Sequence, residues 1–421
     1  MEKLAILGGK PVRTKPFPAV KNIGKEEIAA VNRVLKSGVL SKFLGVWHKD
    51  FYGGPGVQKL EKNWAAHFGV KHAISVNSAT SGLYAAVAAT GVGPGDEVIV
   101  SPYTMSASAA GILVCGAVPV FADIDPKTYC ISAETIKKVL TRRTKAIVVV
   151  DIFGYPADFD GIMALARKYK LTVVEDAAQA PGAKYKGRWA GTLGDVGVFS
   201  LNYHKTIHSG EGGIVVTNND DLANRIQLIR NHAETVVKAK GDRHLAHLIG
   251  FNYRMTEIEA AIAAEQLKKL EKFTKLRIQA AEYINHKLKG IPWLKPFTVQ
   301  AGRRHVYYVL PFQYDEKLAG VPRESFVKAV AAEGVPFAQG YVEPLYMQPI
   351  YQKRASICSY SCPKYKGKVS YAKGICPVTE EMHYKKLVFT TLVHHSLSRK
   401  DVEDVAIAVV KVADNIGSLP R

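Results

Sequence analysis

Short apolar runs that alternate with helical patterns between residues 72 and 217 constrain the fold of this chain more than any other feature. Strands that alternate with helices predict an α/β fold with a mainly parallel sheet covered on both faces. Runs such as Ile147–Val150 fit strands that are buried on both sides. The expected strands are His72–Val76, Glu97–Val100, Val118–Asp123, Ala146–Asp151, Leu171–Glu175, Val196–Ser200 and Ile214–Thr217, and the expected helices are Ser81–Thr90, Met105–Cys115, Ser132–Leu140 and Phe159–Tyr169.

The chain of 421 residues is long enough for two domains with substantial cores. Residues 1–24 are Pro-rich and irregular, which predicts an arm that packs on a neighbouring chain or on a smaller domain. We predict a large domain at 25–270 and a smaller α+β domain at 271–421. A capping box, Thr256-x-x-Glu259, predicts the start of a long helix that links them.

Outside the alternating region the expected elements are less regular. The segment 232–250 is polar and without a clear period, so we expect a long loop there. Residues 25–37 predict a helix with Ile28, Val31 and Val34 on its apolar side. The other expected elements are helices Val57–Phe68, Asp220–Asn231, Arg323–Glu333 and Lys400–Val412, the strand Tyr307–Gln313, and an irregular stretch at 341–376.

Two opposite charges follow neighbouring strands of the predicted sheet. The apolar run Leu171–Val174 ends in Glu175-Asp176, and Lys205 follows the run Val196–Leu201. Ligands of open α/β sheets bind at the carboxyl ends of the strands, so we expect both side chains at a ligand site. A solvated loop lysine and a helix-capping aspartate are the structural alternatives.

Three linked motifs resemble the DegT/DnrJ/EryC1/StrS family of sugar aminotransferases, which depend on pyridoxal 5'-phosphate (PLP). They are Glu175-Asp176-Ala177-Ala178-Gln179, then Gly191-Thr192-Leu193-Gly194-Asp195, then Phe199-Ser200 followed by Lys205 and Gly210-Glu211-Gly212-Gly213. The resemblance covers nearly the whole chain, from about residue 7. It implies PLP fold type I, like that of aspartate aminotransferase, with a large domain built on a seven-stranded sheet.

The resemblance implies a role for each polar residue of these motifs. Lys205 would form the Schiff base with PLP and then serve as a general base. Asp176 would pair with the pyridine nitrogen and keep it protonated. Gln179 would contact the ring hydroxyl.

The turn Ser75–Gly82 joins a strand to a helix N-terminus, where unpaired N–H groups favour a phosphate. The resemblance implies backbone contacts from Ala79 and Thr80, beside Ser78, and hydroxyl contacts from Thr80 and Ser200. Ordinary helix capping explains Ser and Thr in such a turn equally well.

Two further positions concern the cofactor. Family members carry an aromatic residue on the PLP ring where this chain has Met105, so either Met105 covers the ring or Tyr103 takes its place; we favour Met105. The segment Gly250–Met255 resembles the family's asparagine turn, which implies that Asn252 reaches the phosphate of a neighbouring subunit. A homodimer with shared sites follows from this resemblance, and a structural turn before a helix is the alternative.

The formal net charge of +20 suggests anionic ligands. The chain lacks an arginine-rich block or a known nucleic-acid motif, so we expect no nucleic-acid partner and favour a solvated basic surface. No apolar run has transmembrane length and the N-terminus does not resemble a signal peptide, which predicts a cytoplasmic protein without a membrane partner.

The five cysteines predict no disulfide framework. Cys358, Cys362 and Cys376 lack the spacing of a metal site, with His383 as the nearest fourth ligand, so we expect free thiols and no metal.

These observations together predict a PLP-dependent transaminase. The expected donor is glutamate or glutamine, and the expected acceptor is a keto-sugar, nucleotide-linked in the preferred interpretation, or a keto-cyclitol. Two alternatives remain open: a PLP-dependent sugar dehydratase, which Lys205 disfavours because dehydratases carry histidine there, and a non-catalytic regulator with the same fold.

Overall fold

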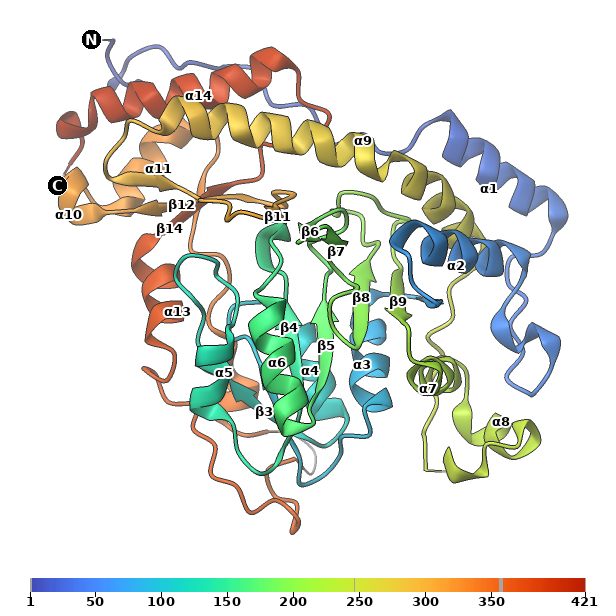
Figure 1. The fold of residues 1–421 in the computed structure, drawn as a ribbon. Coiled ribbons are helices and arrows are strands. Elements are labelled where there is room, and N and C mark those ends of the chain that lie inside the picture. The colour runs from blue at the N-terminus through green and yellow to red at the C-terminus, as the bar shows by residue number, and fades with distance from the viewer. Residues whose placement is uncertain (1, 246, 356–358, 421) are drawn as a thin grey trace.

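The computed structural model describes residues 2–245, 247–355 and 359–420. A seven-stranded sheet forms the centre of the larger part of the molecule (Figure 1). Six strands run parallel, and only β9 runs antiparallel to its two neighbours. The strands, in their order across the sheet, are β1 (His72–Val76), β9 (Gly213–Thr217), β8 (Val196–Ser200), β5 (Thr172–Asp176), β4 (Thr144–Val150), β2 (Glu97–Val100) and β3 (Val118–Phe121). The predicted mainly parallel α/β sheet is confirmed.

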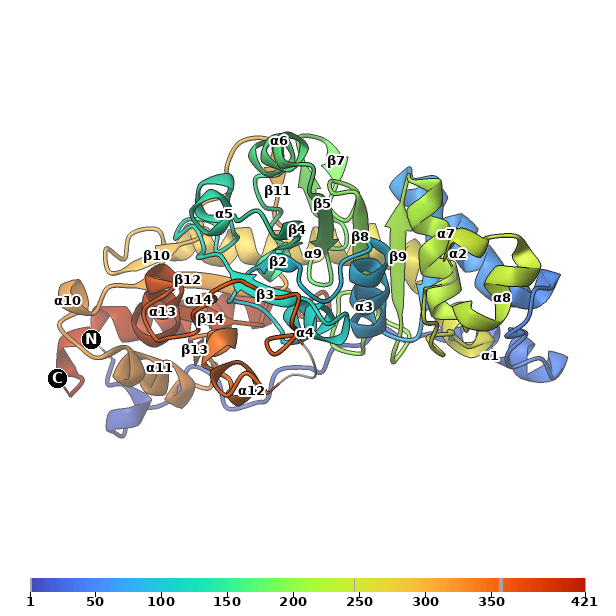
Figure 2. The ribbon, with the colours of Figure 1, turned by 90° about the horizontal axis from the view of Figure 1, so that it is seen from below.

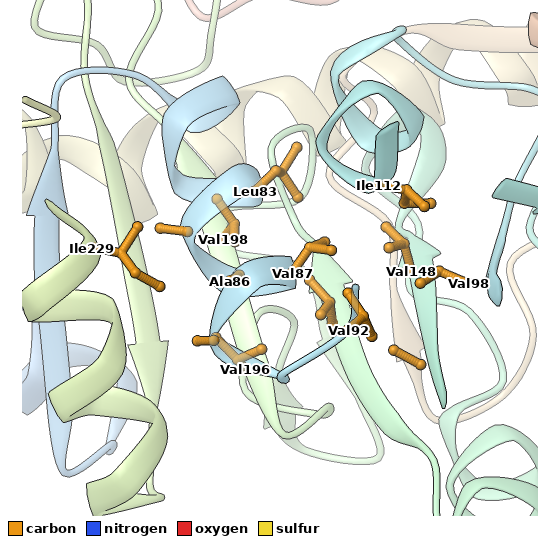
Figure 3. Close-up of a cluster of buried hydrophobic side chains, with 14 of the residues drawn as sticks. Leu83, Ala86, Val87, Val92, Val98, Ile112, Val148, Val196, Val198 and Ile229 are labelled. Atoms are coloured by element: carbon orange, nitrogen blue, oxygen red, sulfur yellow. The ribbon is translucent and has the colours of Figure 1, made fainter. Parts of the chain in front are cut away.

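Helices cover both faces of this sheet (Figures 1 and 2). They are α2 (Pro55–Phe68), α3 (Ala79–Ala89), α4 (Ala107–Val114), α5 (Ala133–Val139), α6 (Phe159–Tyr169) and α7 (Asp220–Arg230). Alternate residues of a strand point to opposite faces. In β4, Val148 therefore joins the core under α3, α4 and α7, whereas Ile147 and Val149 join the core under α5 and α6. Figure 3 shows the first of these cores, where Leu83 and Val87 of α3 pack against Val196 and Val198.

One helix connects the larger and the smaller part of the molecule. Helix α9 (Glu257–Leu288) has 32 residues and begins with the predicted capping box, in which Thr256 Oγ1 accepts from the Glu259 N–H. Its first half packs on α1 (Lys25–Ser37) and α2, and its second half packs beside α14 (Arg399–Asp414). The predicted domain boundary at residue 270 lies inside this helix.

The smaller part contains a four-stranded antiparallel sheet with helices packed against it. Its strands are β10 (Leu294–Pro296), β12 (Leu310–Tyr314), β14 (Leu387–Thr390) and β13 (Ala338–Gln339), and its helices are α10 (Glu316–Ala319), α11 (Arg323–Ala332), α13 (Pro377–Glu381) and α14. The stretch predicted to be irregular contains the short helices η5 (Leu345–Met347) and α12 (Pro349–Gln352). A third, small sheet joins β6 (Lys184–Tyr185), β7 (Arg188–Trp189) and β11 (Arg303–Arg304).

The prediction of a loop at 232–250 is wrong. Residues Ala233–Lys240 form helix α8, and Arg243–Leu245 form a 3-10 turn, η4. Ala233, Val236 and Val237 are buried against the core that α7 also joins. The tertiary contact stabilises a helix too short to show a clear period in the sequence.

The N-terminal arm packs on the smaller part of the same chain, which is one of the two predicted arrangements. Leu4 is buried in its core, and the Ala5 N–H donates to Glu333 Oε1 at 2.8 Å. Arg13 forms ion pairs with Asp401 and Asp404, both at 2.8 Å.

Candidate active site

The carboxyl ends of the parallel strands position the predicted residues at one edge of the sheet. Asp176 is the last residue of β5 and Ser200 the last of β8. After Ser200 the chain folds back on itself, since the Ser209 N–H donates to Leu201 O at 3.0 Å. Lys205 lies in this turn, and its N–H donates to Asn202 O at 2.9 Å.

Lys205 lines a cavity of about 590 Å³ between the large sheet, the smaller sheet and the N-terminal arm. Its Nζ lies 4.6 Å from the centre of the Tyr308 ring, over the aromatic face. Burial lowers the pKa of Lys205 to about 8, although the charge of Asp176 opposes this shift. A fraction of the amine is therefore neutral, and so nucleophilic, near pH 7. The other residues that line the cavity are Pro18, Ala19, Val20, Tyr203, His204, Thr206, His208, Arg277, Val309, Tyr341, Phe389, Thr391, His394 and His395.

Asp176 is buried, and hydrogen bonds hold both of its carboxylate oxygens. Ser108 Oγ donates to Oδ2 at 2.6 Å, and the Ala178 N–H donates to Oδ1 at 3.1 Å. Thr104 lies behind Ser108, with 3.1 Å between the hydroxyl oxygens. Burial raises the pKa of Asp176, whereas these bonds and the charge of Lys205 act to lower it. These contacts fix the orientation of a carboxyl group whose charge interacts with Lys205.

Glu175, the other acidic residue of the motif, has a structural role. It is buried on the opposite face of β5, and its carboxylate accepts from the N–H groups of Gly191, Leu193 and Gly194 at 2.5, 2.7 and 3.0 Å. The glycines of the second motif thus form a loop around this carboxylate. Burial and the charge of Glu175 raise the pKa of the adjacent Asp151 well above its ordinary value.

The side-chain amide of Gln179 is fixed in one orientation. The Phe153 N–H donates to Oε1 at 2.7 Å, and Nε2 donates to Tyr341 Oη at 2.9 Å. Phe153 adopts a positive φ of 60°, a strained conformation for a residue with a side chain. The second hydrogen on Nε2 remains for another acceptor.

The predicted phosphate turn forms the N-terminus of α3. Ser78 caps the helix, and its Oγ accepts from the Ser81 N–H at 3.1 Å. The N–H groups of Ala79 and Thr80 come first in the helix, where no preceding turn offers an acceptor. The start of β9 approaches closely: a Cβ at Gly213 would lie 2.7 Å from the Ala79 nitrogen.

The two candidates for covering the ring differ in their exposure. Tyr103 is completely buried, and its Oη accepts from the Tyr341 N–H at 3.1 Å. Met105 is 63% exposed, at the end of the loop that leads into α4.

The backbone of Asn252 lies beside the predicted phosphate turn of its own chain. Asn77 donates from its N–H to Tyr253 O at 2.9 Å and from Nδ2 to Asn252 O at 3.4 Å. The Asn252 residue is exposed.

The cysteine segment forms no metal site in the part of the chain that the structure describes. Cys358 lies outside the described residues. Cys362 is half-buried, and Cys376 is buried, with its thiol 4.0 Å from Phe121 O. No helix among the described residues is long and apolar enough to cross a membrane.

Sequence reasoning missed four residues of the site: Ser108, Arg277, Tyr308 and Tyr341. Ser108 lies four residues after Thr104, a spacing that could have suggested a hydroxyl pair. The other three come from the linking helix and the smaller part of the chain, and no local pattern connects them with the motifs.

The chain is similar to known aminotransferases over nearly its whole length. The DegT/DnrJ/EryC1/StrS aminotransferase family matches residues 21–410, and the chain belongs to this family. Spore coat polysaccharide biosynthesis protein SpsC of Bacillus subtilis is 37% identical, over 93% of this chain and 96% of its own. L-glutamine:2-deoxy-scyllo-inosose aminotransferase of Streptoalloteichus tenebrarius is 33% identical, over 99% of each chain.

A solved structure confirms the fold. The aminotransferase from Psychrobacter cryohalolentis superposes with a TM-score of 0.83 at 30% identity, and the match covers 96% of this chain and 100% of that one. The protein is therefore a PLP-dependent aminotransferase of fold type I.

Proposed function

We propose that this enzyme transfers an amino group from glutamine or glutamate to a keto-sugar or a keto-cyclitol. The observation that carries the proposal is the proximity of Lys205 to Asp176. Burial lowers the pKa of this lysine to about 8, its charge interacts with the buried carboxylate of Asp176, and it lines a cavity of about 590 Å³. An amine donor and a cyclic ketone are small enough to react in turn in such a cavity.

The residues at the sheet edge fit PLP. The first N–H groups of α3, with Ser78, Thr80 and Ser200 nearby, would hold the phosphate, and Asp176 would hold the protonated ring nitrogen. The free hydrogen of Gln179 Nε2 is available for the ring hydroxyl, and Met105 would cover the exposed ring face. When bound, PLP supplies an electron sink for the carbanion formed on loss of the α-proton.

The surrounding residues bind, orient and shield the reactants. Lys205, once free, would move the proton between the nitrogen-bearing carbon of the substrate and the cofactor, because its lowered pKa lets it both accept and donate a proton near pH 7. The arm residues Pro18, Ala19 and Val20 line the cavity on one side and would shield the reactants from part of the solvent.

The choice of donor and acceptor rests on the relatives. The Streptoalloteichus protein uses glutamine and a keto-cyclitol according to its name, and SpsC is named for polysaccharide biosynthesis. A keto-sugar acceptor, nucleotide-linked or free, and a keto-cyclitol are therefore the candidates. We also propose a homodimer in which Asn252 reaches the partner's phosphate, with domains at 25–270 and 271–421 joined through α9.

The two half-reactions, followed separately, test the proposal. Holoenzyme incubated with glutamine or glutamate should convert bound PLP to pyridoxamine phosphate and release the 2-oxo acid. A panel of keto-sugars and keto-cyclitols should then restore the PLP absorbance with one acceptor class. Loss of water from a sugar without donor consumption would show a dehydratase instead, and failure of both half-reactions would favour a regulator.

A further inference from the structure

Basic residues from the linking helix and the smaller part of the chain line the Lys205 cavity. They are Arg277, His394 and His395, and the described residues that line the cavity include no aspartate or glutamate. Arg277 lies in the middle of α9, and the two histidines lie just before α14. Figure 1 shows these two helices running side by side.

Arg277 is a buried cation without a carboxylate partner among the described residues. It is 6% exposed, and its guanidinium donates only to backbone carbonyls: Nε and Nη2 to Tyr307 O at 3.3 and 3.1 Å, and Nη2 to Tyr308 O at 2.8 Å. Burial of an arginine charge is costly unless an anion compensates it. The carbonyl oxygens compensate part of this cost, but no carboxylate among the described residues neutralises the charge of the guanidinium.

Three polar side-chain atoms of residues that line the same cavity also lack a hydrogen-bond partner within the described structure. They are Thr206 Oγ1, His394 Nδ1 and His395 Nδ1, all buried. His395 Nε2 must be the donor to Lys21 O at 3.1 Å, because a carbonyl oxygen only accepts. Buried polar groups without partners are rare in native proteins. Thr206 Oγ1 and His394 Nδ1 can each donate to an anion, whereas His395 Nδ1, the acceptor nitrogen of its ring, cannot.

The geometry points to an anion subsite formed by Arg277, His394 and Thr206, which receives the carboxylate of the amino donor while its amine reacts at the Lys205 end of the cavity. This inference rests on the proposed function. A carboxylate has two acceptor oxygens that suit a guanidinium and a neighbouring donor. The phosphate of a nucleotide-linked acceptor has the same chemistry, so the experiment separates these two sources.

Burial of the two basic residues agrees with this assignment. Burial and, to a smaller extent, the charge of Arg277 lower the pKa of His394 to about 4. Burial likewise lowers the pKa of Arg277 to about 10. A bound carboxylate would oppose both shifts, because an anion favours the charged form of each group.

The first experiment measures anion binding to the holoenzyme by calorimetry in 0.15 M salt. Glutarate is the carboxylate probe, because it lacks an amine and cannot react, and uridine diphosphate is the phosphate probe. His394→Phe retains the ring volume and removes the ring nitrogens, and Thr206→Val removes a hydroxyl that has no partner. His286→Phe, an exposed histidine on α9, is the matched control.

We expect His394→Phe to weaken glutarate binding roughly ten- to hundredfold, as for a lost hydrogen bond to a charged group. The control and the affinity for uridine diphosphate should not change. Equal glutarate affinity in wild type and His394→Phe would overturn the subsite. Weaker binding of uridine diphosphate alone would overturn the carboxylate assignment and show a phosphate site.

A second measurement distinguishes failure of the subsite from failure of the proposed function. Glutamine and its decarboxylated analogue, 4-aminobutanamide, are compared as donors. The preference of the wild type for glutamine should decrease at least tenfold in His394→Phe, through KM. Transamination with an unchanged preference would reject the subsite and keep the function. Glutarate binding that is sensitive to His394→Phe, in an enzyme that accepts no donor, would keep the subsite and reject the function.

Discussion

Gln179 and Tyr341 connect the two parts of the molecule at the active site, through the 2.9 Å hydrogen bond from the Gln179 amide to the tyrosine hydroxyl. Tyr341 follows β13 of the smaller sheet, and its ring packs edge-on against Phe153 with 5.0 Å between the ring centres. Tyr341 therefore holds the Gln179 side chain through its hydroxyl group and the loop that contains Phe153 through its ring.

Tyr341→Phe should leave the Gln179 Nε2 group without its acceptor. We expect a loss of about 1–3 kcal/mol in the free energy of unfolding, as for a buried donor left unpaired. Urea denaturation of the apoenzyme measures this loss, with Tyr169→Phe, an exposed tyrosine on α6, as the control. Equal stability of the two variants would show that the bond contributes little.

Lys205→Ala should abolish covalent attachment of PLP. The substitution removes the only amine proposed to react with the aldehyde, so borohydride treatment followed by mass spectrometry should find no cofactor bound to the protein. Lys71→Ala, a substitution at an exposed ion pair with Asp220, is the control. Cofactor fixed to the Lys205→Ala chain would reassign the lysine.

Asp176→Asn should retain PLP and lose most transamination, because the ring nitrogen loses its anionic partner. Near-normal turnover would remove Asp176 from this role.

Ser108→Ala should have a milder, pH-dependent effect through the same carboxylate. The Ser108 hydrogen bond acts to lower the pKa of Asp176 against the effect of burial. Its removal raises that pKa further, so the ionised form persists only at higher pH. We expect the acid limb of kcat/KM to move to higher pH, with activity near pH 8 retained. An unshifted acid limb would mean that Asp176 does not control it.

Met105→Ala should weaken PLP retention, whereas Tyr103→Phe should not, if Met105 covers the ring. The exposed position of Met105 and the complete burial of Tyr103 motivate this ranking. Cofactor release during dilution measures it, and the reverse order would transfer the stacking role to Tyr103.

Asn252→Ala should weaken PLP binding by about one to two decades, since a hydrogen bond to a charged group is worth roughly 1.5–3 kcal/mol. Mixed dimers test whether the contact comes from the partner. If it does, pairing an Asn252→Ala chain with a Lys205→Ala chain leaves up to half of the sites intact. Activity no higher than that of the Asn252→Ala homodimer, or a fully active monomer, would contradict shared sites.

The sequence predicted the large sheet well because strands buried on both faces consist of continuous apolar residues. All five residues of β8 and of β9 are buried, and both strands lie within one residue of their predicted bounds. Helix α1 has its predicted bounds, but Ile28 on its predicted apolar side is 58% exposed, whereas Glu27 is buried. Glu27 pairs with Lys269 of α9 at 2.6 Å, a contact that periodicity cannot reveal.

The motifs identified the charged residues at the edge of the sheet, but they did not identify the residues that contact the motif side chains. Ser108 and Tyr341 reach Asp176 and Gln179 across 68 and 162 positions of the chain, so no local spacing records these contacts. The family resemblance likewise carried no information on Arg277, whose partners are backbone carbonyls.

Because α9 is one continuous helix, it fixes the distance between the parts of the molecule that line the cavity. A helix of 32 residues rises about 48 Å, and it resists stretching because each residue adds one hydrogen bond to the next turn. Arg277, on this helix, also holds the Tyr307 and Tyr308 carbonyls beside Lys205. The two sheets therefore cannot slide apart along α9 without unwinding it, and any adjustment to a larger substrate must come from the arm or the loops. An insertion of one residue in α9 before Arg277 would add about 1.5 Å and also turn Arg277 by about 100° away from the cavity, whereas insertions in the loops would change only its walls.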